Sequence, residues 1–295
     1  MKKTIISITI LLTVLTAFNG CTVVLTDENN EIKEVKEVFD TQETYIEDEQ
    51  SVDEVKTAND ESQEPSEETV LPVSDSHNYV TEAYEGEITA PDGTVLATYD
   101  YSYPVFELNE DDNAEFLATI NQMFKKNALN VKSNTEKEYE TLIQEYEYVT
   151  EDDGHWFGPY DYRYGYEIHA NAKGIISVTE FWYYYSGGVH GNTFRESHTF
   201  DVVGGNELEL SALLYGTQER ITEAFTNEFM KIKDAFFDDP SEVVPKELPN
   251  AQYYVDADGV TVYFQQYQVG PYSSGFVSAT ISDKKMLKYD FSTME

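Results

Sequence analysis

Hydrophobic and polar residues change their spacing several times along this chain, and each change predicts an element. Two strand-like runs, at residues 84–89 and 95–105, flank the turn sequence APDG at 90–93, so they predict a β-hairpin. Apolar residues then recur at three- and four-residue spacing after the capping and acidic residues 108–112, which predicts two helices. The apolar positions of these helices are Phe116, Ile120, Met123 and Phe124, followed by Tyr139, Leu142, Ile143 and Tyr146.

The middle of the chain returns to strand-like spacing. Three runs follow one another at residues 162–170, 175–185 and 193–203, and glycine-containing turns separate them. Because short turns join antiparallel neighbours, these runs predict an antiparallel meander.

One more helix and three strands are predicted in the last third. Either Ser211 or Thr217 caps the helix, and Pro240 and Pro245 are expected to break the chain after it. The apolar stripe of this helix, expected in the core, is Ile221, Phe225, Phe229, Ile232 and Phe236. Strands are predicted at 251–255, 260–265 and 276–281, with a hairpin turn at 256–259. This order of elements predicts an α+β fold, with antiparallel sheets and helices packed on one face.

Residues 21–78 differ in composition from everything after them. They contain 18 acidic and three basic residues and few aromatic ones, which predicts a disordered, self-repelling acidic linker. A transient helix at 31–39 is the local alternative. The predicted organisation is a signal peptide at 1–20, the linker at 21–78, an amino-terminal α+β subdomain at 79–170 and a carboxy-terminal one at 171–295.

The amino terminus has the pattern of an export signal. Lys2 and Lys3 precede an apolar stretch at 5–18, which is too short for a comfortable membrane span. Cys21 follows it and is the only cysteine, so no internal disulfide can form. The stretch resembles a bacterial lipoprotein signal, which implies that Cys21 is lipidated on sulfur and anchors the chain to the extracytoplasmic face of a bacterial cell membrane. An ordinary secretion signal with an unused cysteine is the alternative.

The chain is strongly acidic. Its formal net charge is -37, and residues 79–295 alone carry about -24. Such a field repels nucleic-acid phosphates and attracts cationic proteins, so no nucleic-acid partner is expected. Solubility outside the cell is the simpler explanation, and capture of a cationic protein is the functional one. The 23 tyrosines and 16 phenylalanines still allow a sizeable core.

Two adjoining sequences carry the candidate binding residues. In FWYYY at 181–185, strand alternation puts Phe181, Tyr183 and Tyr185 on one face and Trp182 and Tyr184 on the other. One set is expected in the core, and the other is expected to be exposed as an interaction surface. SGGVHGN at 186–192 follows as a turn, and its glycines suit positive φ or a close backbone approach.

Metal and catalytic chemistry find little support in the sequence. His190, with His198 and His155 as co-ligands, is a conceivable metal site, but the close ligand spacing typical of zinc sites is absent. The favoured interpretation of His190 is a turn histidine bonded to backbone groups. Asp256 and Asp258 belong to a turn more readily than to a calcium loop. The chain has no nucleophile elbow and no phosphate-binding loop. We therefore predict no cofactor, no metal site and no catalytic residue.

The chain resembles a known family in four features that follow one another in this order: SGGVHGN at 186–192, the helix after it, the hairpin within 253–264 and YQVGPYSSG at 267–275. It is the extracytoplasmic domain family of the RsiV-type lysozyme-sensing anti-sigma factors, found also in the amino-terminal regions of PdaC-type deacetylases. The resemblance covers about residues 79–295. The sigma-binding segment and the catalytic domain of those relatives have no counterpart here, so a stand-alone ectodomain on a tether is expected.

The resemblance and the charge together predict a membrane-tethered, non-enzymatic binding lipoprotein. The expected ligand is a basic wall-lytic protein such as lysozyme, or the glycan of peptidoglycan. A cell-wall-modifying enzyme using carboxylates and His190 is the alternative, and a structural role is a third. The loops around His190 and Tyr272 are expected to lie close together. The predicted binding residues are Trp182, Tyr184, Gly187, Gly188, His190, Asn192, Pro271 and Tyr272.

Overall fold

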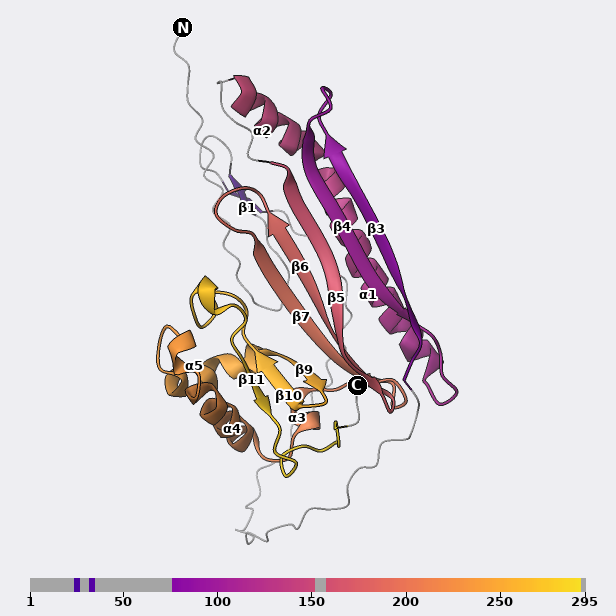
Figure 1. Ribbon diagram of the computed structural model, residues 1–295, viewed down its shortest axis with the longest axis vertical. Helices are drawn as coiled ribbons and strands as arrows, with labels where there is room; N and C mark the ends of the chain where they lie inside the picture. The colour runs from indigo at the N-terminus through magenta and orange to yellow at the C-terminus, as the bar shows by residue number, and fades with distance from the viewer. Residues whose placement is uncertain (1–23, 27–31, 35–75, 152–157, 293–295) are drawn as a thin grey trace. The chain divides into compact units, whose positions relative to one another are not determined.

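A six-stranded sheet is the largest element of the structure, a computed structural model that describes residues 24–26, 32–34, 76–151 and 158–292 (Figure 1). The strand order is β3-β4-β5-β6-β7-β8. All neighbouring pairs are antiparallel except β4 and β5, which are parallel. The strands are β3 (Tyr79–Thr89), β4 (Val95–Phe106), β5 (Tyr160–Ala172), β6 (Ile175–Tyr185), β7 (Asn192–Asp201) and β8 (Asn206–Glu207).

The helices α1 (Ala114–Lys137) and α2 (Tyr139–Glu151) connect β4 to β5 and cover one face of this sheet (Figure 1). The predicted α+β class and the meander of β5, β6 and β7 are confirmed. The expectation of an antiparallel sheet throughout is wrong for one pair. Helices α1 and α2 return the chain to the end of the sheet where β4 begins, so β5 runs in the same direction as β4.

Helix α1 begins later than the sequence predicted. Its N-cap is Asn113, whose side-chain oxygen accepts a hydrogen bond from the Phe116 N–H at 3.1 Å. Residues 108–112 therefore precede the helix instead of opening it. The buried face of α1 packs on the sheet against Tyr101, Tyr103, Tyr164, Ile176, Val178 and Phe200.

The other side of the sheet carries a second layer. It contains a three-stranded antiparallel sheet in the order β11-β10-β9. Its elements are β9 (Gln252–Asp256), β10 (Gly259–Tyr263), β11 (Ser278–Ile281), α3 (Leu210–Leu213), α4 (Gln218–Met230), α5 (Pro240–Glu247) and the short 3-10 helices Lys233–Ala235, Leu248–Asn250 and Tyr272–Ser274. One apolar core joins this layer to Ala170 and Ile175 of the large sheet.

Two predictions for this layer need correction. Thr217 caps α4 as one of the two expected residues, but α4 ends at Met230, so Ile232 is 40% exposed instead of buried. Pro240 does not end helical structure. It is the first residue of α5, where its missing N–H costs nothing, and Asp239 caps that helix by accepting from the Ser241 N–H at 2.9 Å. Pro245 lies inside α5.

The amino-terminal edge of the folded part includes His77, two residues before the predicted start at 79. Its ring is buried, with Nε2 3.0 Å from an Asp112 carboxylate oxygen and Nδ1 3.1 Å from the Asn171 side-chain oxygen. These contacts tie the start of β3 to β5 and to the segment before α1. The predicted boundary after Ala170 falls within the β5–β6 hairpin.

The chain divides into two units, residues 1–62 and 63–295, and the first is described here by itself. Its described residues are β1 (Val24–Thr26) and β2 (Ile32–Glu34), which pair antiparallel, so residues 32–34 form a strand and not part of the transient helix considered at 31–39. Val, Ile and Thr favour extended pairing. The predicted signal peptide, Cys21 and most of the predicted linker lie outside the described residues. Within the described part of the chain, no helix is both long and apolar enough to cross a membrane.

Candidate functional site

The loop between β6 and β7 is held in a defined shape. Gly187 and Gly188 have φ of 89° and 93°, which non-glycine residues rarely adopt. The Tyr185 hydroxyl donates to the Gly188 carbonyl at 3.1 Å and so braces the turn. Val189 lies at the tip of the loop and is 99% exposed.

This loop contacts the loop that carries Tyr272. The rings of His190 and Tyr272 stack with centroids 3.8 Å apart, and the Tyr272 hydroxyl donates to the Gly191 carbonyl at 3.1 Å. The Tyr267 hydroxyl lies 3.3 Å from His190 Nε2. The prediction that these two loops lie close together is confirmed. His190 Nδ1 also lies 2.9 Å from the Gly191 carbonyl, as expected for a turn histidine.

The glycine and proline before Tyr272 have structural roles. A Cβ on Gly270 would lie 2.0 Å from the Ala235 carbonyl oxygen, so only glycine permits this backbone approach. Pro271 precedes the 3-10 turn Tyr272–Ser274 with φ of -67°, a value that its ring favours. These residues place the Tyr272 ring over His190.

The aromatic run at 181–185 does not divide as predicted. Phe181, Tyr183 and Tyr185 are half-buried, as is Trp182, so neither set forms a fully buried core. Trp182 packs between Tyr164 and Phe194 on the helix-covered face, with ring centroids 5.3 and 5.8 Å away. Tyr184 is 41% exposed and packs against Tyr162. Asn192, exposed, begins β7 beside the loop.

Three glutamines join the second layer to β7 and thereby align the two loops. Backbone N–H groups of β7 donate to the side-chain oxygens of Gln266, Gln265 and Gln252 at 3.2, 3.1 and 2.8 Å. Gln265 also donates to the Arg195 carbonyl at 2.6 Å. The side chains therefore take the place of a neighbouring strand along this edge of β7. Because Gln266 precedes Tyr267, this docking brings Tyr267 and Tyr272 beside His190.

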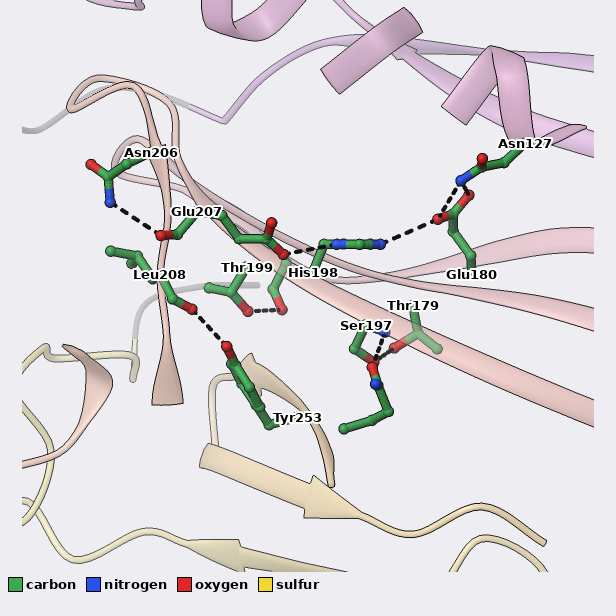
Figure 2. A network of polar contacts seen from close by, with 12 residues as sticks. Asn127, Thr179, Glu180, Ser197, His198, Thr199, Asn206, Glu207, Leu208 and Tyr253 are labelled. Carbon is green, nitrogen blue, oxygen red and sulfur yellow. Dashed lines mark hydrogen bonds and ion pairs between the residues drawn. The ribbon is translucent and has the colours of Figure 1, made fainter. Parts of the chain in front are cut away.

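A buried ionic network lies under α1 (Figure 2). Glu180 on β6 is fully buried, accepts hydrogen bonds from Asn127 of α1 at 3.2 Å, and also accepts from the Tyr164 hydroxyl. His198 on β7 lies 3.4 Å from Glu180 and 2.8 Å from Glu207. Figure 2 shows Glu207, His198, Glu180 and Asn127 in one line of contacts, with Ser197 and Thr179 on the other side of the strands.

The network makes His198 cationic. Burial disfavours the charged ring, but hydrogen bonds and charge attraction from Glu180 and Glu207 outweigh it and raise the pKa of His198 to about 10. Glu196 pairs directly with Glu180 in the strand register, and burial raises the pKa of Glu196. The imidazolium thus offsets the repulsion of neighbouring carboxyl groups.

Sequence reasoning missed Glu180, although a signal was present. Ile176, Val178 and Glu180 share one face of β6 because they lie two residues apart. A carboxyl group on an otherwise apolar face needs a buried partner. His198 was considered only as a metal ligand with His190 and His155. The described polar partners of His198 are carboxylates. The described partners of His190 are tyrosines and a backbone carbonyl, and His155 lies outside the described residues. Among the described side chains no metal-binding group of three gathers.

These observations define an α+β protein in which the two motif loops are in contact. Residues 92–193 match a family model described as Deacetylase PdaC, and residues 213–284 match one described as Protein of unknown function (DUF3298). The family predicted from the two motifs is confirmed. His190 lies in the first matched region and Tyr272 in the second, so their stacking joins the two.

One solved structure shows the same fold, and a second is similar to a lower degree. A DUF3298 family member from Bacteroides fragilis NCTC 9343 is 16% identical, with a TM-score of 0.55 over 71% of this chain and 91% of its own. A DUF3298 family protein from Pseudomonas aeruginosa PAO1 is 14% identical, with a TM-score of 0.45 over 74% and 97%. The comparison with curated proteins gives no match.

Proposed function

We propose that this chain is an extracytoplasmic binding lipoprotein, anchored to a bacterial cell membrane through Cys21, that captures a cationic protein such as lysozyme. The observation that carries the proposal is the contact between the two motif loops. Beside this contact Val189 is 99% exposed and Tyr267 is 52% exposed, and the Tyr267 hydroxyl lies 3.3 Å from His190 Nε2. Exposed apolar and aromatic side chains held in one conformation are effective interface anchors, because little entropy is lost when they bind.

The charge of the chain supports a cationic ligand. The acidic field attracts a basic protein over distances of about 10 Å at moderate salt and mainly accelerates association. The loop residues then provide the short-range contacts. We therefore expect binding that weakens with salt but still depends on individual loop side chains.

Retention of a basic lysozyme on the immobilised full-length chain tests the proposal. We expect retention at low salt, a loss at high salt, and at least about tenfold weaker binding of the Tyr267→Ala variant, as for an interface anchor. Tyr84→Ala is the matched control, since Tyr84 is 47% exposed on β3. No retention by the unaltered chain, or equal weakening by both variants, would contradict the proposal. Retention of peptidoglycan fragments instead would identify the glycan as ligand.

A cell-wall-modifying enzyme is the second candidate, because the description of the model matched by residues 92–193 names a deacetylase. The described contacts of His190 are with two tyrosines and a backbone carbonyl, and none is with a carboxylate. Muropeptides should therefore be unchanged after incubation with the chain. A modified product that disappears with His190→Ala would favour the enzyme.

A further inference from the structure

A cavity of about 260 Å³ lies beside the β6–β7 loop, on the side of α2. It is smaller than the roughly 300–1,000 Å³ of pockets for drug-sized ligands, so its size suits a single side chain. Helix α2, the first residue of β5 and the loop after β6 all contribute to its wall. The lining residues are Glu145, Tyr148, Val149, Tyr160, Ser186, Gly187 and Gly188.

One carboxyl group and two aromatic rings determine the chemistry of this cavity. Among the described lining residues Glu145 has the only carboxyl group, and its Oε2 accepts a hydrogen bond from the Tyr160 hydroxyl at 3.0 Å. Burial, together with this hydrogen bond, raises the pKa of Tyr160 to about 12, so the phenol stays protonated and keeps the carboxylate oriented. Tyr148, 71% exposed, provides a second ring at the rim.

Two glycines of the β6–β7 loop form the wall of the cavity opposite α2 and leave that side open. Gly187 and Gly188 have no side chains, and a Cβ built on Gly188 would meet nothing within 4 Å. Their positive φ and the hydrogen bond from Tyr185 to the Gly188 carbonyl maintain that open wall. The glycines therefore shape the cavity as well as the turn.

We infer that this cavity binds the cationic head of a lysine or arginine side chain from the captured protein. A carboxylate next to aromatic faces attracts a cation through charge and cation–π interactions, and the acidic field of the chain disfavours an anion. The inference rests on the proposed function, since it names the part of a basic partner that is recognised. It adds a pocket for one side chain beside the loop surface.

The test uses a small probe and the full-length chain. Nα-acetyl-lysine methylamide, titrated while the tyrosine NMR signals are followed, should shift signals of Tyr148 and Tyr160. Glu145→Gln should weaken binding at least about fivefold, as expected when a cation loses its carboxylate partner. Glu140→Gln, an exposed site on the same helix with the same charge change, should leave binding unaltered. Tyr148→Leu, which keeps the charge, should also weaken binding.

Two outcomes would overturn the inference. One is equal binding by the Glu145→Gln and Glu140→Gln variants, which would mean that only net charge attracts the probe. The other is equal binding of the Nε-acetylated probe, which carries no side-chain charge. The small-probe result is independent of lysozyme retention, so failure of the pocket and failure of the proposed function can be told apart.

Discussion

His198 and His190 lie eight residues apart, yet the structure uses them in opposite ways. His198 is nearly buried between Glu180 and Glu207, and those carboxylates raise its pKa to about 10. His190 stacks on Tyr272 near an exposed loop tip, with a backbone carbonyl and a phenol as its polar partners. The first is part of the support of the sheet, and the second joins two loops at the surface.

The difference shows that the chemical type of a residue does not decide its role. Glu180 is fully buried and His198 is largely buried, so breaking the contact between them would leave a buried charge without compensation and would destabilise the fold. His190 is exposed to solvent, so the loss of one of its contacts should lower the stability of the fold less. Substitutions in the two regions should therefore affect different quantities, namely global stability at His198 and ligand binding at His190.

Removal of Glu180 should have the largest effect. In Glu180→Ala, His198 loses one of its two carboxylate partners, and Tyr164 and Asn127 lose an acceptor. The free energy of unfolding should fall by about 3–5 kcal/mol, as for other broken buried ion pairs. Urea unfolding measures this, with His190→Ala, expected at about 1 kcal/mol or less, as the comparison. Similar values for both variants would remove the distinction between the two regions.

Alkaline pH should weaken the same network. The pKa of His198 is about 10 in the folded state, above its ordinary value, so the folded protein binds this proton more tightly. The stabilisation is complete below about pH 6.5 and is lost as pH rises toward 10, with a decrease of about 2–4 kcal/mol. Unfolding measured from pH 6 to pH 10 should show this slope, and His198→Gln should flatten it. An unaltered slope in His198→Gln would assign the effect to other groups.

Gly270→Ala should disturb the loop pair through packing. The new methyl group would lie 2.0 Å from the Ala235 carbonyl oxygen, and backbone on both sides must move. We expect a loss of about 1–3 kcal/mol, typical of overpacking, together with weaker lysozyme retention. Gly275→Ala is the control, because its added methyl group meets nothing within 4 Å, although φ is 63°. If retention falls equally in both, the approach of Gly270 to Ala235 is not what places Tyr272.

The smallest effect is expected for Tyr272→Phe. This change keeps the ring stacked on His190 and removes only the hydrogen bond to the Gly191 carbonyl. Stability should fall by about 1 kcal/mol or less, the usual net value of one hydrogen bond. Tyr272→Leu also removes the stacking and should reduce lysozyme retention further. Full retention by Tyr272→Leu would show that the stacked pair does not organise the binding surface.

The sequence by itself predicted the local elements. Strand alternation, apolar spacing and turn residues identified the β3–β4 hairpin, the helices α1, α2 and α4, the meander of β5 to β7 and the β9–β10 hairpin, because these patterns depend on neighbouring residues. It also predicted that the loops of His190 and Tyr272 meet, from the pairing of two motifs.

Only the tertiary structure decided which distant residues became partners. The register of β6 and β7 places His198 diagonally next to Glu180, and α1 supplies Asn127 above them. The parallel pairing of β4 with β5 and the glutamine contacts along β7 also depend on how elements far apart in sequence pack. Local patterns determine an element and its faces, but register and packing determine what each face meets. For that reason the His190 loop could be found from the sequence, and the Glu180 network could not.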